Sequence, residues 1–119
     1  MTIENKNSLG PGFEVKGSQM RYRDAFNNTL RAELEHDENV LIIGEDISGG
    51  FDKKTKEPLD AWGGPFAATK GLVQDFGVER IMDAPISEAG FVGAAIGAAL
   101  TGLRPVVDLM YFDFTTVAF

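Results

Sequence analysis

The segment from Asp83 to Pro105 constrains the fold of this chain more than any other. It reads DAPISEAGFVGAAIGAALTGLRP, and residues 88–101 predict a helix made almost entirely of glycine, alanine and apolar residues. A helix with so many glycines has weak intrinsic propensity, so it forms where its backbone packs closely against other elements. We therefore expect this helix to be buried all round, with Ser87 as its N-cap.

Shorter patterns on either side of this helix alternate between strand and helix. Residues 40–43 are apolar on both faces, which is typical of a buried parallel strand. Residues 80–84 and 104–111 predict two further strands, whereas residues 19–37 and 66–76 show a helical repeat, and another helix follows the third strand. This alternation predicts an α/β fold, in which a parallel sheet carries helices on both faces.

The apolar positions of the two predicted helices before the second strand should face the core. In the first helix these positions recur every four residues, and in the second they are bulky apolar residues. They are Tyr22, Phe26, Leu30 and Leu34, followed by Phe66, Leu72, Val73 and Phe76. Residues 1–18 are polar and glycine-containing, so we expect a flexible or partner-binding arm. Residues 19–119 are expected to form the N-terminal part of one domain, because three strands are too few for a complete doubly wound domain. Residues 47–65 predict a long loop.

Composition excludes several classes of function. The net charge of −7 argues against a nucleic-acid partner and against docking on anionic lipid. The chain has no cysteine, and its single histidine, His36, cannot build a zinc site. The glycine pairs do not follow a strand as phosphate-binding loops do. The N-terminus has no secretory signal pattern, and no apolar run reaches the roughly 20 residues that span a bilayer. We expect a cytoplasmic protein.

Carboxylates at the ends of two predicted elements are the candidate functional groups. Glu45 and Asp46 follow the first strand, and ligands of open α/β sheets bind at the carboxyl ends of strands. Asp46 is expected to be a solvated loop residue, whereas for Glu45 the solvated and the ligand-binding alternatives stay open. Glu88 begins the apolar helix. It either interacts with the helix dipole, which contributes about 0.3–1 kcal/mol, or serves a buried cofactor.

Two long segments carry a resemblance to a known family. They are YRDAFNNTLRAELEHDENVLIIGEDI and RIMDAPISEAGFVGAAIGAALTGLRPVVDLMYFDF, and they contain GED, then PISE-x-G, then G-x-RP. From about Met20 to Phe119 the chain resembles the β subunit of the thiamine-diphosphate-dependent 2-oxoacid dehydrogenase first component, in its transketolase-like pyrimidine-binding domain. The stretch DAWGG…TKGL is most similar to acetoin dehydrogenase β subunits.

The resemblance implies a set of site residues. In the family the glutamate of the S-E motif hydrogen-bonds N1′ of the cofactor aminopyrimidine, and here that residue is Glu88. Ile86 and Ser87 line the same pocket, and Glu45 of the GED motif is a second carboxylate near the cofactor. Further positions that pack on the pyrimidine or face the substrate are Met110, Tyr111 and Phe114. Family members often carry a polar residue at the position of Met110.

The resemblance also implies a cofactor and partners. The cofactor is thiamine diphosphate, whose diphosphate and Mg²⁺ are held by the partner α subunit. An α subunit, a second β subunit and a lipoyl-bearing acyltransferase are the expected partners, in an oxidoreductase that decarboxylates a 2-oxoacid or cleaves acetoin and passes the acyl unit to lipoamide. This chain alone holds at most half of that active site. The alternative is a truncated, non-catalytic subunit that serves as an association module.

Overall fold

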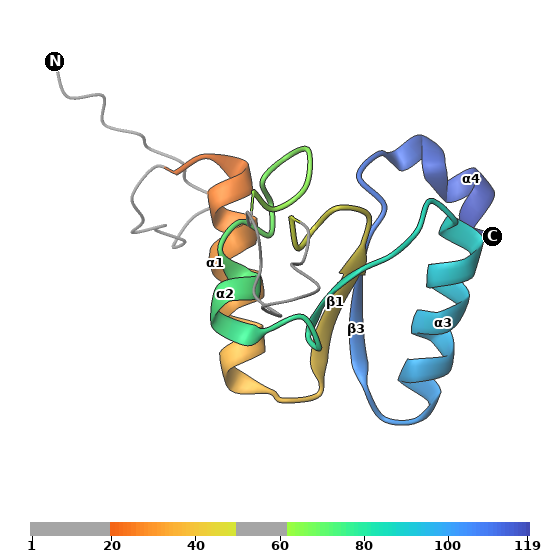
Figure 1. The fold of residues 1–119 in the computed structure, drawn as a ribbon, viewed down its shortest axis with the longest axis horizontal. Coiled ribbons are helices and arrows are strands. Elements are labelled where there is room, and N and C mark those ends of the chain that lie inside the picture. Colours follow the sequence, from red (N-terminus) through yellow and green to blue (C-terminus); the bar gives the residue numbers. More distant parts are fainter. Residues whose placement is uncertain (1–19, 50–61) are drawn as a thin grey trace, which may run out of the picture.

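The computed structural model describes residues 20–49 and 62–119. Helices and strands alternate along the described chain (Figure 1). They are α1 Tyr22–His36, β1 Val40–Gly44, α2 Leu72–Phe76, β2 Ile81–Asp83, α3 Glu88–Leu100, β3 Arg104–Asp108, the 3₁₀ helix η1 Phe112–Phe114 and α4 Thr115–Ala118. The predicted arm at residues 1–18 and most of the predicted loop at 47–65 lie outside the described residues.

The three strands of the described chain form one parallel sheet in the order β2-β1-β3. The apolar run of β1 takes the central place, because only a central strand has both of its faces and both of its edges covered. Gly44 at the end of β1 pairs with Asp83 of β2 and with Asp108 of β3. All three strands therefore end at the same level, and the predicted α/β fold with a parallel sheet is confirmed.

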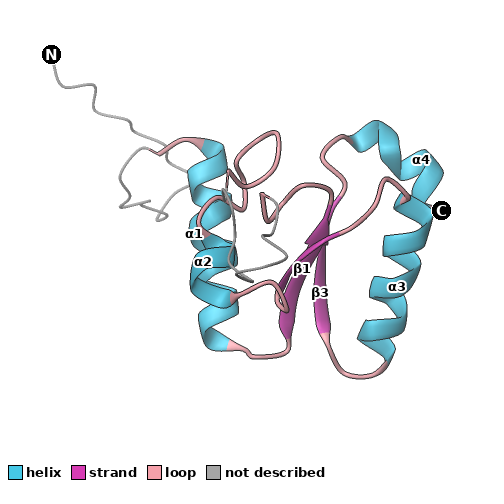
Figure 2. Ribbon diagram, viewed as in Figure 1, coloured by secondary structure: helices cyan, strands magenta, loops and turns pink. Residues whose placement is uncertain are grey.

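Helices cover both faces of the sheet. Figure 2 shows α1 and α2 on one side of the strands and α3 with α4 on the other. The main core lies between the sheet and the first pair of helices, and it consists of fully buried aliphatic side chains. These are Leu34, Val40, Ile42, Ile47, Leu72, Val73 and Ile81. On the opposite face, α3 buries only Phe91 and Ala95.

The prediction that α3 is buried all round is wrong for the described chain. Its bounds agree with the predicted helix to within a residue, but Ile96 is 59% and Leu100 85% exposed. A Cβ added at Gly93 or Gly97 would meet nothing within 4 Å. The reason is that one sheet covers only one side of a helix. The outer side of α3 stays uncovered although it carries no charged residue.

The predicted helix at 66–76 is correct only in its second half. Residues 65–71 are turns, and α2 begins at Leu72. Gly71 has φ of +82° and Ala67 has φ of +54°, so the backbone leaves the right-handed helical region twice before α2 starts. As a result Phe66 is 46% exposed instead of buried, whereas Leu72 and Val73 do enter the core.

The burial of the first helix and the length of the last strand are both smaller than predicted. Tyr22 and Phe26 are 83% and 52% exposed, because both side chains line an open groove between α1 and β3 instead of entering the core. The third strand ends at Asp108 rather than at residue 111. Met110 has φ of +61°, a left-handed conformation that a strand cannot contain.

Candidate functional site

The carboxyl ends of the strands bring the predicted site segments to one edge of the sheet. β1 leads directly into Glu45, β2 leads through residues 84–87 into Glu88, and β3 leads into Met110. Since Gly44 pairs with the last residue of both neighbouring strands, these three exits lie side by side. The sheet therefore assembles at one place residues that are more than 60 positions apart in the sequence.

Glu45 is buried, so its alternative as a solvated loop residue is wrong. Only 9% of the residue is exposed, and its Oε1 atom has no hydrogen-bond partner within the described part of the chain. Burial raises the pKa of Glu45, and the negative charges of Glu88 and Asp46 raise it further. Asp46 itself is exposed, as predicted. Glu88 is thus close enough to Glu45 for its negative charge to disfavour the charged form of Glu45.

This raised pKa predicts how stability depends on pH. The folded state holds the Glu45 proton at pH values where the unfolded chain has already lost it, so the folded state binds more protons in that window. The free energy of unfolding should therefore fall as pH rises from the ordinary glutamate pKa of 4.5 through the higher folded value. Glu45→Gln should remove this dependence and raise stability at neutral pH.

Urea unfolding of the variant across this pH window tests that prediction. The control is Glu35→Gln on the exposed side of α1, which should keep the pH dependence of the wild type. A Glu45→Gln protein that loses stability with rising pH as steeply as the wild type would contradict the assignment.

Glu88 is the first residue of α3 and is half-buried. Ser87 occupies the predicted N-cap position, yet its side chain makes no capping hydrogen bond. The hydroxyl of Ser87 instead lies against Gly90, where an added Cβ would come within 2.7 Å of Oγ. Ile86 is 86% exposed at the same edge. The helix thus starts with a carboxylate and an open apolar side chain beside the buried Glu45.

The residues after β3 place aromatic rings at this edge. The amide of Met110 donates to Oδ1 of Asp108 at 2.8 Å, which fixes the turn out of the strand. The ring of Tyr111 lies between Phe66 and Phe114, with centroid distances of 5.2 and 5.5 Å and edge-to-face geometry. Such pairs are favourable beyond the area they bury. The predicted residues Tyr111 and Phe114 therefore do come together, and Phe66 joins them.

Sequence reasoning missed several residues that shape this edge. Both the amide and the hydroxyl of Ser48 donate to the carboxylate of Asp83, the amide at 2.8 Å. A Cβ at Gly44 would lie 2.8 Å from the carbonyl oxygen of Asp108, so only glycine fits there. The sequence predicts Phe66 inside a helix, whereas the structure has it in a turn. The one available signal was that Gly44 directly follows one predicted strand and that Asp83 lies near the end of another.

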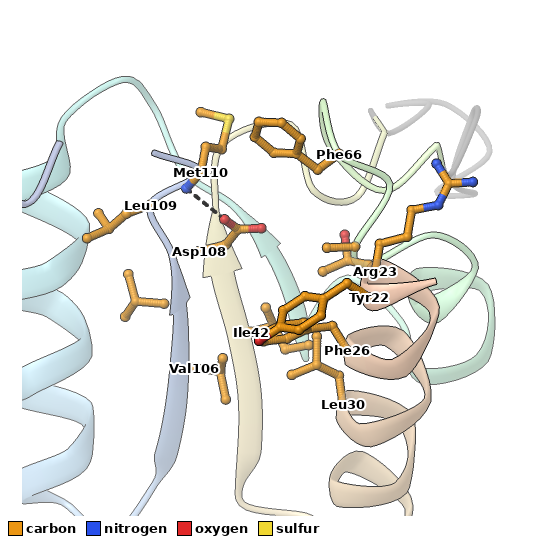
Figure 3. Close-up of a pocket in the computed structure, with 13 residues that line it drawn as sticks. Tyr22, Arg23, Phe26, Leu30, Ile42, Phe66, Val106, Asp108, Leu109 and Met110 are labelled. Carbon is orange, nitrogen blue, oxygen red and sulfur yellow. Dashed lines mark hydrogen bonds between the residues drawn. The ribbon is translucent and has the colours of Figure 1, made fainter. Parts of the chain in front are cut away.

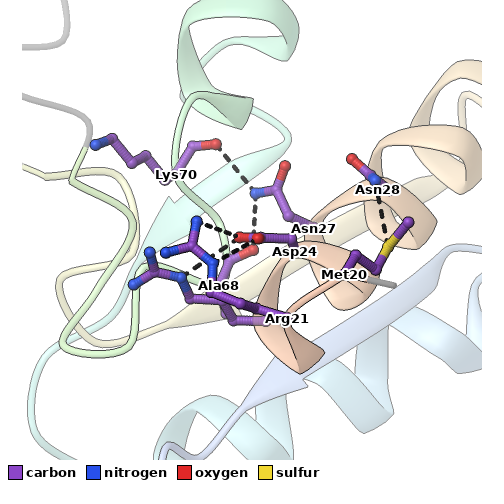
Figure 4. Close-up of polar contacts among 8 residues, drawn as sticks. Met20, Arg21, Asp24, Asn27, Asn28, Ala68 and Lys70 are labelled. Carbon is purple, nitrogen blue, oxygen red and sulfur yellow. Dashed lines mark hydrogen bonds and ion pairs between the residues drawn. The ribbon is translucent and has the colours of Figure 1, made fainter. Parts of the chain in front are cut away.

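The turn that carries Phe66 is tied to α1. The side-chain amide nitrogen Nδ2 of Asn27 donates to the carbonyl oxygens of Ala68, at 2.8 Å, and of Lys70, at 3.0 Å (Figure 4). Nearby, Arg21 pairs with Asp24 at 2.7 Å, but the Arg21 side chain is 70% exposed, and pairs with an exposed partner contribute little to stability. The bonds from Asn27 therefore connect this turn directly to the helix.

An apolar groove of about 520 Å³ runs between α1 and β3. Figure 3 shows Tyr22 and Phe26 reaching from α1 toward Ile42, with Phe66 and Met110 at the other end of the groove. Neither predicted carboxylate lines it. The groove meets the candidate site only at its rim, so its size carries no argument about the chemistry there.

Residues 20–49 and 62–119 contain neither a cluster of metal-binding side chains nor a membrane-spanning helix. No group of three or more histidine, cysteine or acidic side chains in these ranges is arranged to hold a metal ion. No helix within them has the length and apolar character needed to cross a membrane.

Comparison with known proteins gives consistent matches. Residues 18–119 match the family described as the transketolase pyrimidine-binding domain. The chain is 51% identical over 96 residues to the β subunit of the acetoin:2,6-dichlorophenolindophenol oxidoreductase of Bacillus subtilis, covering 81% of this chain and 28% of that protein. The corresponding subunit of Cupriavidus necator is 45% identical over 95 residues, covering 80% of this chain and 27% of the relative.

A third relative comes from a different complex. The mitochondrial β subunit of the pyruvate dehydrogenase E1 component of Pisum sativum is 37% identical over 121 residues, covering 98% of this chain and 30% of the relative. The chain thus spans less than a third of the length of these three relatives.

Proposed function

Because the chain belongs to the family of transketolase pyrimidine-binding domains, we propose that it supplies the aminopyrimidine half of a thiamine diphosphate site. The enzyme is the first component of a 2-oxoacid or acetoin dehydrogenase complex, in which this chain acts as part of a β subunit. The resemblance predicted from the GED and PISE motifs is confirmed at the level of the family. In this proposal residues 19–119 contribute to the pyrimidine-binding domain, and catalysis requires the partner subunits.

The observation that carries the proposal is the proximity of two carboxylates, Glu45 after β1 and Glu88 at the start of α3. Glu45 is buried with an oxygen that lacks a partner among the described residues, and Glu88 is near enough to affect its ionisation. Burying an unpaired carboxylate oxygen is costly, so such groups mark functional sites more often than structural ones. The half-buried carboxylate and the exposed faces of Ile86 and Tyr111 fit a flat heterocycle with basic ring nitrogens.

Each residue has a defined role in this proposal. Glu88 donates a hydrogen bond to, or shares a proton with, N1′ of the aminopyrimidine. Glu45 keeps the neighbouring charge balance, since burial and the charge of Glu88 raise its pKa and so favour its neutral form. Tyr111 and Phe114 offer aromatic faces for packing against the ring. When bound, the cofactor supplies a carbanion-forming carbon for 2-oxoacid or acetoin cleavage.

The same proposal assigns the rest of the site to partners. The α subunit binds the diphosphate and Mg²⁺, a second β subunit completes the heterotetramer, and a lipoyl-bearing acyltransferase accepts the acyl unit. In support, the relatives named above are β subunits of E1-type or acetoin-oxidising enzymes.

The test is exchange of the cofactor C2 hydrogen in the complete αβ assembly with Glu88→Gln. Loss of exchange by orders of magnitude is the expected result, and unchanged exchange contradicts the proposal.

A second candidate function is an association module without catalysis, and the outer side of α3 favours it. This side is uncharged and carries exposed apolar residues beside open glycines. Exposed apolar area of this kind marks a protein interface. The two candidates are compatible, because a catalytic β subunit also has to associate. One result distinguishes the two candidate functions. Only the association module predicts oligomers that bind no cofactor and that still form in Glu88→Gln.

Gly97→Leu should separate folding from association. Within this chain the new side chain meets open space, and replacing a helical glycine by leucine adds about 0.5–1 kcal/mol of helix stability. At a closely packed interface the same side chain would block the approach of the partner backbone. We expect normal circular dichroism and thermal stability but loss of the assembly in sedimentation velocity. The control is Ala32→Leu on the exposed side of α1, which should assemble normally.

A further inference from the structure

The turn that follows β1 is held from three sides. It consists of residues 45–48 and contains Asp46 in the left-handed conformation, with φ of +54°. Ile47 is fully buried in the main core, and its carbonyl oxygen accepts a hydrogen bond from Thr69 Oγ1 at 2.9 Å. Ser48, only 3% exposed, gives both its amide and its hydroxyl to Asp83. The turn is therefore a fixed part of the structure.

Asp83 closes this arrangement against the sheet. It is the last residue of β2 and pairs with Gly44, the residue immediately before Glu45. The amide of Ala84 donates to the carbonyl oxygen of Gly44 at 2.8 Å, so the two chains stay joined beyond the pair. Hydrogen bonds to a carboxylate are the stronger kind, and two of them fix the direction of the Ser48 backbone. Glu45 thus lies in the chain between Gly44 and Ser48, both of which are held by hydrogen bonds at the end of β2.

The same carboxylate also lies on the segment that carries the second acid. Glu88 follows Asp83 by five positions, through a short connection that includes Pro85. Asp83 therefore connects the segment that leads to Glu88 with the turn that carries Glu45. We propose that Asp83, through its two hydrogen bonds to Ser48, is a positioning residue that sets how Glu45 faces Glu88. This inference rests on the function proposed above, since it gives the pair of carboxylates its geometry.

The charges around Glu45 determine how its pKa would change if the turn at residues 45–48 were loosened. Glu88 from α3 and Asp46 from the turn itself raise the pKa of Glu45 after burial. Asp83 from β2 and Asp108 from β3 also end at this edge, where they accept hydrogen bonds from Ser48 and Met110. A turn that opens admits water to Glu45 and moves it from Glu88, and both changes move the pKa of Glu45 down toward its ordinary value.

Ser48→Ala tests the proposal without changing any charge. Infrared spectra of the complete, cofactor-free αβ assembly are recorded across pH, and the protonated carboxyl band of Glu45 is assigned by its loss in Glu45→Gln. We expect the midpoint of this band to move to lower pH in Ser48→Ala. The control is Val73→Ala, which opens the core at α2 and leaves the bonds to Asp83 intact, so its midpoint should equal that of the wild type.

The outcomes separate this inference from the proposed function. A midpoint in Ser48→Ala that equals the wild-type value overturns the positioning role, whatever the cofactor does, because the measurement needs none. In the loaded assembly, Asp83→Asn should lower the rate of C2 hydrogen exchange by about 10-fold to 100-fold, the range expected for misplaced groups. Full exchange in Asp83→Asn together with lost exchange in Glu88→Gln would leave the proposed function intact and remove the role of Asp83.

Discussion

Glu88→Gln in the complete αβ assembly should lower the rate of C2 hydrogen exchange by about 10²-fold to 10⁴-fold, the range that a positioned acid or base contributes. The variant keeps the shape and size of the side chain and removes its ability to hold a proton at the ring nitrogen. Because Glu88 is half-buried at the start of α3 and makes no hydrogen bond that the fold depends on within the described residues, the fold should survive.

The measurement has two parts. Exchange is followed by quenching the assembly in deuterated buffer and reading the C2 hydrogen of the cofactor by proton NMR, with the amount of bound cofactor measured in parallel. Glu35→Gln, an exposed acid on α1, is the matched control and should exchange like the wild type. An assembly that carries Glu88→Gln and exchanges at the wild-type rate would leave only the helix-dipole role for this residue.

The regular elements could be predicted because their signals are local. The apolar run of β1 and the glycine-rich α3 each have a pattern that fits one structure, and both bounds agree closely with the structure. The parallel sheet then follows from the alternation of helices and strands. The sequence did not predict correctly how much of the apolar faces of α1 and α3 is buried. Tyr22 and Ile96 are apolar, but whether another element covers them depends on chain or partner surfaces that this sheet does not provide.

Sequence reasoning proposed the two acids of the candidate site but missed the residues that support them. The rule that ligands bind at the carboxyl ends of strands led to Glu45, and the resemblance led to Glu88. The bond between Ser48 and Asp83 joins residues 35 positions apart, so no local pattern could reveal it. Phe66 was missed for a related reason, since its contact with Tyr111 depends on the turn conformation at Ala67.

Ile47→Ala should reduce the free energy of unfolding by about 2–5 kcal/mol, as expected for an aliphatic core residue truncated to alanine. Ile47 has no exposed surface and lies among the fully buried residues of the main core. It is also two residues from Glu45, so the cavity opens directly beneath the turn that carries the buried acid. The loss should therefore appear in stability and at the candidate site together.

A graded series distinguishes packing from a general loss of structure. Ile47→Val removes a single methyl group and should cost about 0.5–1.5 kcal/mol. Urea unfolding of the complete αβ assembly, or of its isolated β subunit if that folds, gives both values. The pH dependence attributed to Glu45 should weaken in the same order, because a less tightly held turn exposes the carboxyl to water. If alanine at position 47 lowers stability but leaves that pH dependence unchanged, the core does not hold Glu45 in place, and the turn depends on its polar contacts alone.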